Sequence, residues 1–194
     1  MKFIAITNNF QPGEQVFYHL SDTAMLNQGK PFFIPDFANP CLAGIQLAVR
    51  ISRLGRSISE RYAHRYYDGV SVCCTFTAQN LLDMLQAKGL PWEMATGFDG
   101  AACIGKVFET NDATEIGKME FSMQINGSMI QQGFVRDMRT GIDKMIAQCS
   151  EYFMLRQGDF LLLGCPTEDW YEVKENDQVE GFVNNQKLLS FKVK

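Results

Sequence analysis

The strongest constraint in this sequence is an apolar–polar alternation that leads into an Asn-Gly pair. Residues 119–125 (MEFSMQI) place a large apolar side chain at every second position, and on a β-strand these side chains lie on one face. Asn126 and Gly127 follow, and both residue types tolerate the positive φ of a type I′ turn. The segment therefore predicts a β-hairpin that returns along Met129–Gln132.

Short apolar runs predict several more strands, at Lys2–Thr7, Cys41–Ser52, Val70–Phe76 and Phe160–Gly164. The run at 160–164 (FLLLG) is short and almost wholly apolar, which is typical of a central strand. A closing hairpin is predicted from Val179–Val183 and Leu188–Val193, joined by Asn184-Asn185.

Helical signals are fewer. A short helix is expected over Glu14–Met25, before a turn at 27–30. Ser57 and Glu60 have capping-box spacing, which predicts a helix to about Tyr67. An amphipathic helix is predicted over Ala78–Lys88 with Gly89 as its stop. Another follows from helical spacing at Ile142, Met145, Ile146, Cys149 and Phe153. Together these patterns predict a β-rich α+β fold.

Composition narrows the class of protein. The chain has 194 residues, 46% of them apolar, which suits one buried core and a single domain. Its 22 acids and 18 bases are scattered, so neither nucleic acid nor a membrane is an expected partner. The start, MKFIAITNNF, is too short an apolar run for a signal-peptide core, which predicts a cytoplasmic location. The six cysteines show no CxxC spacing and are expected to be buried and reduced.

Six segments follow one another in a specific order: AGIQL (43–47), TFTAQN (75–80), TGFDG (96–100), ING (125–127), VRDM (135–138) and GDFLLLGCP (158–166). In that order they resemble the motifs of the fumarylacetoacetate hydrolase family. The resemblance implies a mixed β-roll or sandwich with a few short peripheral helices. It places a β-roll at 41–194, on which an N-terminal strand, short helix and loop (1–40) would pack within one domain, 1–194. It also implies a homodimer.

The family resemblance also implies where an active site would lie. In that family a Glu-x-Glu strand and an Asp on its neighbour hold a divalent cation, which grips the oxygens of a 2-oxo or β-diketo acid. The matching positions here are Gly44, Gln46 and Thr75. Thr96 matches the family lysine, Val135 a family threonine, and Gly164-Cys165-Pro166 the Gly-Thr-Pro loop. Because all three carboxylates and the lysine are replaced, we expect no metal and no cofactor.

Four other side chains are candidates, each with a structural alternative. Asp99 is either a displaced ligand or a turn-capping residue. Asp137 and Arg139 either bind an anionic substrate or belong to a surface salt-bridge cluster with Arg136. Cys165 is either a nucleophile or a packed thiol.

Glu60 and His64 lie four residues apart on the predicted helix. They are either an acid–base or metal pair, or an exposed intrahelical contact.

Three functions follow from these alternatives. The first is a family scaffold with a degraded active site, non-catalytic or binding a small organic acid or neutral ligand. The second is a hydrolase, decarboxylase or isomerase of small 2-oxo or β-diketo acids that depends on Mg²⁺ or Mn²⁺. The third is a structural subunit of a homo- or heterodimer.

Overall fold

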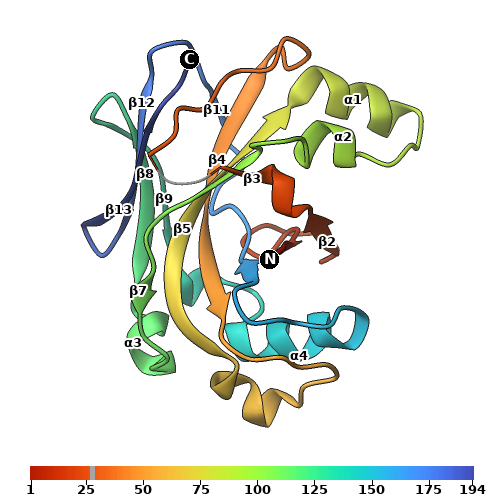
Figure 1. Ribbon diagram of the computed structural model, residues 1–194, viewed down its shortest axis with the longest axis vertical. Helices are drawn as coiled ribbons and strands as arrows, with labels where there is room; N and C mark the ends of the chain where they lie inside the picture. Colours follow the sequence, from red (N-terminus) through yellow and green to blue (C-terminus); the bar gives the residue numbers. More distant parts are fainter. Residues whose placement is uncertain (27–28) are drawn as a thin grey trace.

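The computed structural model of the protein describes residues 1–26 and 29–194. Its strands form two sheets (Figure 1). The larger sheet has the order β2-β1-β10-β4-β5-β6-β3, with β11 beside β4 and β7 beside β5. The smaller has the order β13-β12-β8-β9. The described residues thus have the β-rich architecture that the sequence predicts.

The strands of the larger sheet are β1 (Phe3–Ile6), β2 (Phe17–Leu20), β3 (Met25–Leu26), β4 (Cys41–Ile51), β5 (Tyr67–Ala78), β6 (Ala102–Ile104), β7 (Phe108–Glu109), β10 (Phe160–Leu162) and β11 (Tyr171–Glu172). Those of the smaller sheet are β8 (Glu120–Ile125), β9 (Ser128–Phe134), β12 (Gln178–Val183) and β13 (Gln186–Lys192). The α-helices are α1 (Gln79–Ala87), α2 (Glu93–Thr96), α3 (Ala113–Gly117) and α4 (Ile142–Tyr152). The 3₁₀ helices are η1 (Asp22–Ala24), η2 (Glu60–Arg65) and η3 (Val135–Asp137).

The long antiparallel pair of β4 and β5 forms the centre of the molecule (Figure 1). One face of this pair packs on the smaller sheet through Ile45, Leu47 and Val72, which belong to the main apolar core with Met123 of β8. On the other face, Ala48 and Cys73 join a second apolar cluster, which includes side chains from β1 and β10 of the same sheet. Burial on both faces explains why the β4 segment reads as an almost continuous apolar run.

Both predicted hairpins are confirmed. Asn126 and Gly127 have φ values of 53° and 80°, and Asn184 and Asn185 have 46° and 64°, as a two-residue turn of this kind requires. The helices predicted at 78–88 and from 142 onward correspond to α1 and α4. β10 lies between β1 and β4, which confirms that the FLLL run is a central strand.

The helix predicted over Glu14–Met25 is wrong. Residues 17–20 form β2, which pairs antiparallel with β1, and only residues 22–24 turn as η1. Pairing with β2 satisfies the backbone hydrogen-bonding groups along one edge of β1. The stabilisation from this pairing outweighs the weak helix propensity of the segment. The turn predicted at 27–30 falls partly on residues 27 and 28, which lie outside the described residues.

The capping box predicted at Ser57 and Glu60 does not form. Ser57 has a φ of 51°, and its amide donates to the Ser150 carbonyl at 2.9 Å, so it cannot begin the helix. The chain turns instead as the 3₁₀ helix η2, from Glu60 to Arg65. With three residues per turn, positions four apart point about 120° away from each other. Glu60 and His64 therefore do not share a helix face.

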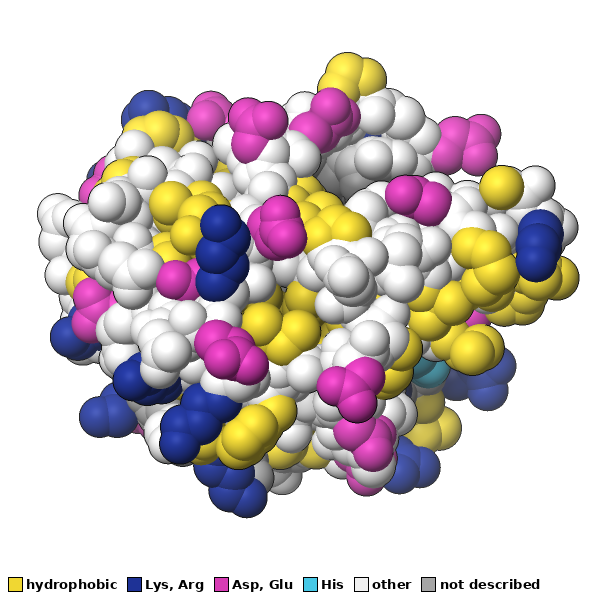
Figure 2. All heavy atoms as spheres, turned by 90° about the horizontal axis from the view of Figure 1, so that it is seen from above, with side chains coloured by type: hydrophobic (Ala, Val, Ile, Leu, Met, Phe, Trp, Pro, Cys, Tyr) yellow, Lys and Arg dark blue, Asp and Glu magenta, His cyan; other side chains and the backbone are white. Residues whose placement is uncertain are grey.

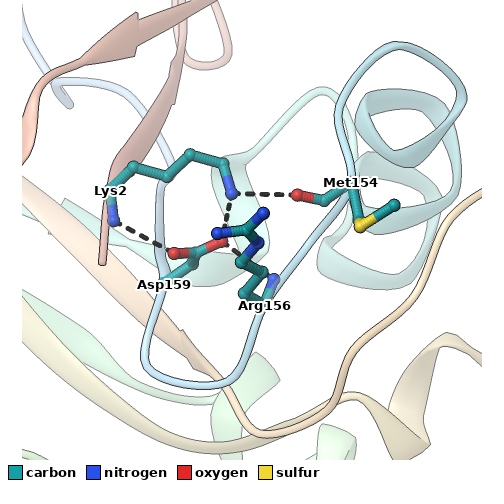
Figure 3. A network of polar contacts seen from close by, with 4 residues as sticks. All are labelled: Lys2, Met154, Arg156 and Asp159. Atoms are coloured by element: carbon teal, nitrogen blue, oxygen red, sulfur yellow. Dashed lines mark hydrogen bonds and ion pairs between the residues drawn. The ribbon is translucent and has the colours of Figure 1, made fainter.

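The N-terminal region is part of the larger sheet, since β1 pairs in parallel with β10. A polar clamp fixes this long-range contact (Figure 3). Asp159, 1% exposed, accepts from the Lys2 backbone amide at 3.0 Å and from the Arg156 amide at 2.9 Å, and it forms an ion pair with the Lys2 ammonium. The same ammonium donates to the Met154 carbonyl at 2.9 Å. One buried carboxylate thus joins the start of β1 to the turn before β10.

On the face that Figure 2 shows, charged side chains of both signs lie among apolar and neutral atoms. Within residues 1–26 and 29–194, no helix is both long and apolar enough to cross a membrane.

We predict that Asp159→Ala lowers the free energy of unfolding by about 2–4 kcal/mol, because it leaves buried donors and one ammonium without their acceptor. Urea denaturation measures this value. Asp137→Ala is the matched control, since this exposed carboxylate lies 3.9 Å from Arg136, and it should change stability by no more than about 0.5 kcal/mol. Equal losses of stability from the two substitutions would contradict the role of Asp159 in joining β1 to the turn before β10.

Candidate functional site

Three positions on β4 and β5 define the candidate site. Gly44 and Thr75 are direct register partners, and Gln46 is the next residue on the same face. Both polar side chains are buried, Gln46 at 3% and Thr75 at 5% exposure. The sequence-predicted positions 44, 46 and 75 are therefore brought together, as alternation along paired strands requires.

The polar groups of this site satisfy one another. The Gln46 amide nitrogen donates to the Thr75 hydroxyl at 3.0 Å, and the Gln46 amide oxygen accepts from the Gly164 backbone amide at 3.1 Å. The Thr75 hydroxyl lies 3.4 Å from the Gly44 carbonyl. Gly164 has a φ of 93°, which favours glycine at the point where the chain meets Gln46. The result is a closed network of neutral groups.

Trp170 and Cys165 cover Gly44. A Cβ atom at position 44 would lie 3.0 Å from the Cys165 sulfur and 3.0 Å from two ring atoms of Trp170. The space where a longer side chain would begin is therefore already filled.

Gln131 fixes the loop that carries Trp170. Its buried amide nitrogen donates to the Thr167 hydroxyl at 3.1 Å and to the Asp169 carbonyl at 2.8 Å, while its oxygen accepts from the Ile45 amide at 2.8 Å. A single side chain from β9 thereby ties the 165–170 loop to β4, which holds the Trp170 ring over Gly44.

Two small cavities border the network. One has a volume of about 210 Å³ and is lined by Thr7, Tyr18, Leu20, Thr75, Phe76, Thr77, Leu82, Gln86, Trp92, Thr96 and Trp170. None of the described residues that line it is charged. The other, of about 260 Å³, is lined by Ile6, Thr7, Asn8, Gln11, Tyr18, Gln46, Gly164, Cys165, Thr167, Glu168 and Trp170. We call the first the aromatic cavity, because the Tyr18 and Trp92 rings meet edge to face at 4.9 Å in its wall.

Two weak acids beside the site stay protonated near neutral pH. Burial, reinforced by Cys165 and Cys73, raises the pKa of Tyr18 well above its usual range. Burial also raises the pKa of the Cys165 thiol, against a smaller lowering by a hydrogen bond with Thr75. A neutral thiol is a poor nucleophile. The close packing of the Cys165 sulfur beside Gly44 and the raised pKa of its thiol both favour the packed-thiol alternative for Cys165 over the nucleophile.

The residues at this site do not fit the divalent cation of the family pattern. Gln46 and Thr75 present neutral oxygens that are already engaged, and position 44 has no side chain. A hard cation such as Mg²⁺ keeps its water unless at least one or two carboxylates replace it. Across residues 1–26 and 29–194, no three His, Cys, Asp or Glu side chains are grouped closely enough to hold a metal ion.

The other positions predicted from the family motifs lie as follows. Thr96, at the end of α2, joins Thr75 in the aromatic cavity. Val135 does not reach this site; it lines a separate cavity beside α4. Pro166 lies in the covering loop, and its carbonyl accepts from the Gln11 side chain at 3.0 Å.

The remaining candidate residues have structural surroundings. Asp99 is exposed in the turn after α2 and lines neither cavity of the site. Asp137 is exposed beside Arg136. One guanidinium nitrogen of Arg139 lies 2.8–2.9 Å from three backbone carbonyl oxygens of the 8–13 loop, which share its two hydrogens, so this side chain holds the loop in place.

The aromatic residues of the site were missed by sequence reasoning. Tyr18 falls in the segment expected to be a helix, and Trp170 in a loop with no readable pattern. The one available signal was a tryptophan in the polar stretch TEDWYE, directly after the Gly-Cys-Pro segment. Large aromatic side chains in polar loops often pack into a site.

Comparison with known proteins decides the family. The model described as "Fumarylacetoacetate (FAA) hydrolase C-terminal" matches residues 4–191. The chain belongs to the fumarylacetoacetate hydrolase family. The resemblance drawn from the motifs is thus confirmed.

Several relatives of this family member carry enzyme names. The chain is 28% identical over 182 residues to the bovine protein named oxaloacetate tautomerase FAHD1, mitochondrial, covering 94% of this chain and 82% of that protein. A structure described as a putative fumarylacetoacetate hydrolase family protein from Yersinia pestis superposes with a TM-score of 0.91 at 27% identity, covering 100% of this chain and 93% of that one.

A third relative was solved with ligands. Fumarylpyruvate hydrolase from Pseudomonas aeruginosa, in complex with Mn²⁺ and pyruvate, superposes with a TM-score of 0.90 at 21% identity, covering 100% of this chain and 89% of that one. At that identity the likeness shows the shared fold. The predicted fumarylacetoacetate hydrolase fold is confirmed by these superpositions.

We predict that Gly44→Glu lowers the free energy of unfolding by at least about 2 kcal/mol, because the side chain displaces Trp170 and buries a carboxylate without a partner. Urea denaturation in the wild-type and the Trp170→Ala background gives a double-mutant cycle. The loss of unfolding free energy caused by Gly44→Glu should be smaller in the Trp170→Ala background, because the space beside position 44 is open there. Equal costs in both would show that Trp170 does not fill the position.

Proposed function

We propose that this member of the fumarylacetoacetate hydrolase family binds a small uncharged organic ligand and does not use the family's divalent cation. The observation that carries the proposal is the covered glycine: Cys165 and Trp170 occupy the space beside Gly44, at a position where the family pattern has a carboxylate. The site is then a non-catalytic descendant of a cation site.

The aromatic cavity sets the class of ligand. Its walls combine aromatic rings from Tyr18, Trp92 and Trp170 with the hydroxyl-bearing residues Thr77 and Thr96. A volume of about 210 Å³ admits a fragment-sized molecule. Because a charged ligand would lose its hydration without gaining a counter-charge, the cavity favours a planar neutral molecule with one or two polar atoms.

The second candidate is a metal-dependent hydrolase, decarboxylase or isomerase of small 2-oxo acids, with Mg²⁺ or Mn²⁺ as cofactor. Its support is the bovine relative, which is named oxaloacetate tautomerase and aligns with 94% of this chain. The Mn²⁺ and pyruvate in the fumarylpyruvate hydrolase structure point the same way. The argument against this candidate is that the side-chain oxygens of Gln46 and Thr75, which would have to bind the metal ion, are uncharged and already hydrogen-bonded.

We predict that the protein shows no stoichiometric binding of Mg²⁺ or Mn²⁺ up to millimolar concentration, with or without oxalate, because no carboxylate at the site offsets the hydration of the ion. Isothermal titration calorimetry measures this directly. Micromolar binding with one ion per chain would contradict the proposal and support the metal-dependent enzyme.

A gain-of-charge variant serves as the control. Gln46→Glu with Thr75→Asp restores two carboxylates to the same face, so its melting temperature should fall without metal and rise again with Mn²⁺. The double variant Gln46→Leu with Thr75→Val removes the same hydrogen bonds without adding acids. It should lose stability and show no response to Mn²⁺.

We further predict that benzamide raises the melting temperature more than benzoate does at equal concentration, because the aromatic cavity offers hydroxyl groups and rings but no counter-charge. Differential scanning fluorimetry compares the two probes, which share one ring and differ in charge. Thr96→Ile, which fills the cavity with an apolar side chain, should abolish the difference. A larger shift with benzoate would instead favour an anionic ligand.

A further inference from the structure

The aromatic cavity and its neighbour at the site share part of their walls. Three residues, Thr7, Tyr18 and Trp170, line both of them. The aromatic cavity has a volume of about 210 Å³ and its neighbour about 260 Å³, whereas pockets that hold a small-molecule ligand usually exceed roughly 300 Å³. Each cavity alone is therefore small for such a ligand, but the two together reach this range. We call the neighbour the polar cavity.

The shared wall is held in place by contacts that do not depend on a ligand. Tyr18 is the register partner of Ala5 in the β1–β2 pair, and its ring packs edge to face on Trp92 at 4.9 Å. Trp170 lies in the loop that Gln131 ties to β4 through three hydrogen bonds. The two rings thus form a fixed surface along which one ligand can contact both cavities.

The polar cavity offers hydrogen-bond acceptors. The side-chain nitrogen of Asn8 donates to the Glu14 carbonyl at 2.7 Å, and that of Gln11 donates to the Pro166 carbonyl at 3.0 Å. The side-chain oxygens of Asn8 and Gln11 have no protein partner among residues 1–26 and 29–194. Because an amide oxygen accepts hydrogen bonds and cannot donate them, both amides are left with unused acceptors.

The charge at the polar cavity also favours a donor. Glu168, an exposed residue, is the one charged side chain among the described residues that line it. None of the ion pairs in the described part of the chain involves Glu168. An anionic group there would meet a like charge and no counter-charge, whereas a group with N–H or O–H donors would meet three acceptors. The polar cavity therefore differs in chemistry from the aromatic cavity.

We propose that the two cavities bind the two ends of one elongated ligand, a planar uncharged ring in the aromatic cavity and a hydrogen-bond donor group in the polar cavity. The proposal rests on the function proposed above, and it adds the length of the ligand and the chemistry of its second end. The linker between the two ends contacts Tyr18 and Trp170. Joining the ends raises the affinity, because the bound ring holds the donor group at high effective concentration beside the polar cavity.

The test compares three uncharged probes by isothermal titration calorimetry on the full chain: benzamide, N-benzoylglycinamide and the methyl ester of N-benzoylglycine. The glycinamide adds a chain that ends in an N–H₂ group, and the ester has a chain of similar length that ends without a donor. We expect the glycinamide to bind at least about tenfold more tightly than benzamide and at least about threefold more tightly than the ester.

A steric variant assigns the second end of the ligand to the polar cavity. Glu168→Trp adds a bulky side chain to its wall, and the wild-type melting temperature should be retained because position 168 is exposed. The ratio of glycinamide affinity to benzamide affinity should fall to about one in this variant. Glu172→Trp is the matched control, since this exposed glutamate of β11 lines neither cavity, and the ratio should stay at its wild-type value.

The outcomes separate this proposal from the proposed function. If benzamide binds and the glycinamide binds no more tightly, the two-ended ligand is wrong while the proposed function stands. Equal affinities for the glycinamide and the ester, or an unchanged affinity ratio in Glu168→Trp, would overturn the donor role of the polar cavity. If none of the three probes binds at millimolar concentration, both the proposed function and the two-ended ligand are wrong.

Discussion

The pairing of β4 with β5 is the interaction on which the rest of the structure depends. The ladder runs from Cys41 opposite Ala78 to Ile51 opposite Tyr67. Because side chains alternate, this single register decides two things at once. It turns Ile45 and Leu47 toward the smaller sheet, and it turns Gly44 and Gln46 toward the candidate site. If the β4–β5 register shifted by one residue, the side chains of β4 that now pack in the core would face the candidate site, and those of the site would face the core.

The polar groups of the candidate site are hydrogen-bonded to one another. In the family pattern, carboxylates at these positions repel one another until a cation joins them. Here Gln46, Thr75 and the Gly164 amide donate and accept among themselves, and no ion is required to hold them in place. Trp170 adds an apolar cover that Gln131 fixes from the neighbouring sheet. Neutral hydrogen bonds and close packing thus hold these side chains in place.

Much of the fold was predictable from local patterns. The Asn126-Gly127 hairpin, the FLLL strand and the α1 and α4 helices follow from periodicity and turn chemistry, which act over a few residues. The failures share one cause. Residues 14–25 and the Ser57 capping box looked helical in isolation, but β1 and the end of α4 compete for the same backbone groups. Such long-range hydrogen bonds leave no trace in a short window of sequence.

The sequence by itself determined the family, the order of the strands and helices around the two Asn-containing hairpins, and the uncharged residues at positions 44, 46 and 75. These properties depend on residue type and spacing. Only the tertiary structure decided that Trp170 and Cys165 fill the space beside Gly44, that Arg139 clamps a loop, and that Tyr18 and Trp170 line two cavities at once. Each of these depends on contacts between segments distant in the chain, and close packing selects among such contacts only once the whole core is assembled.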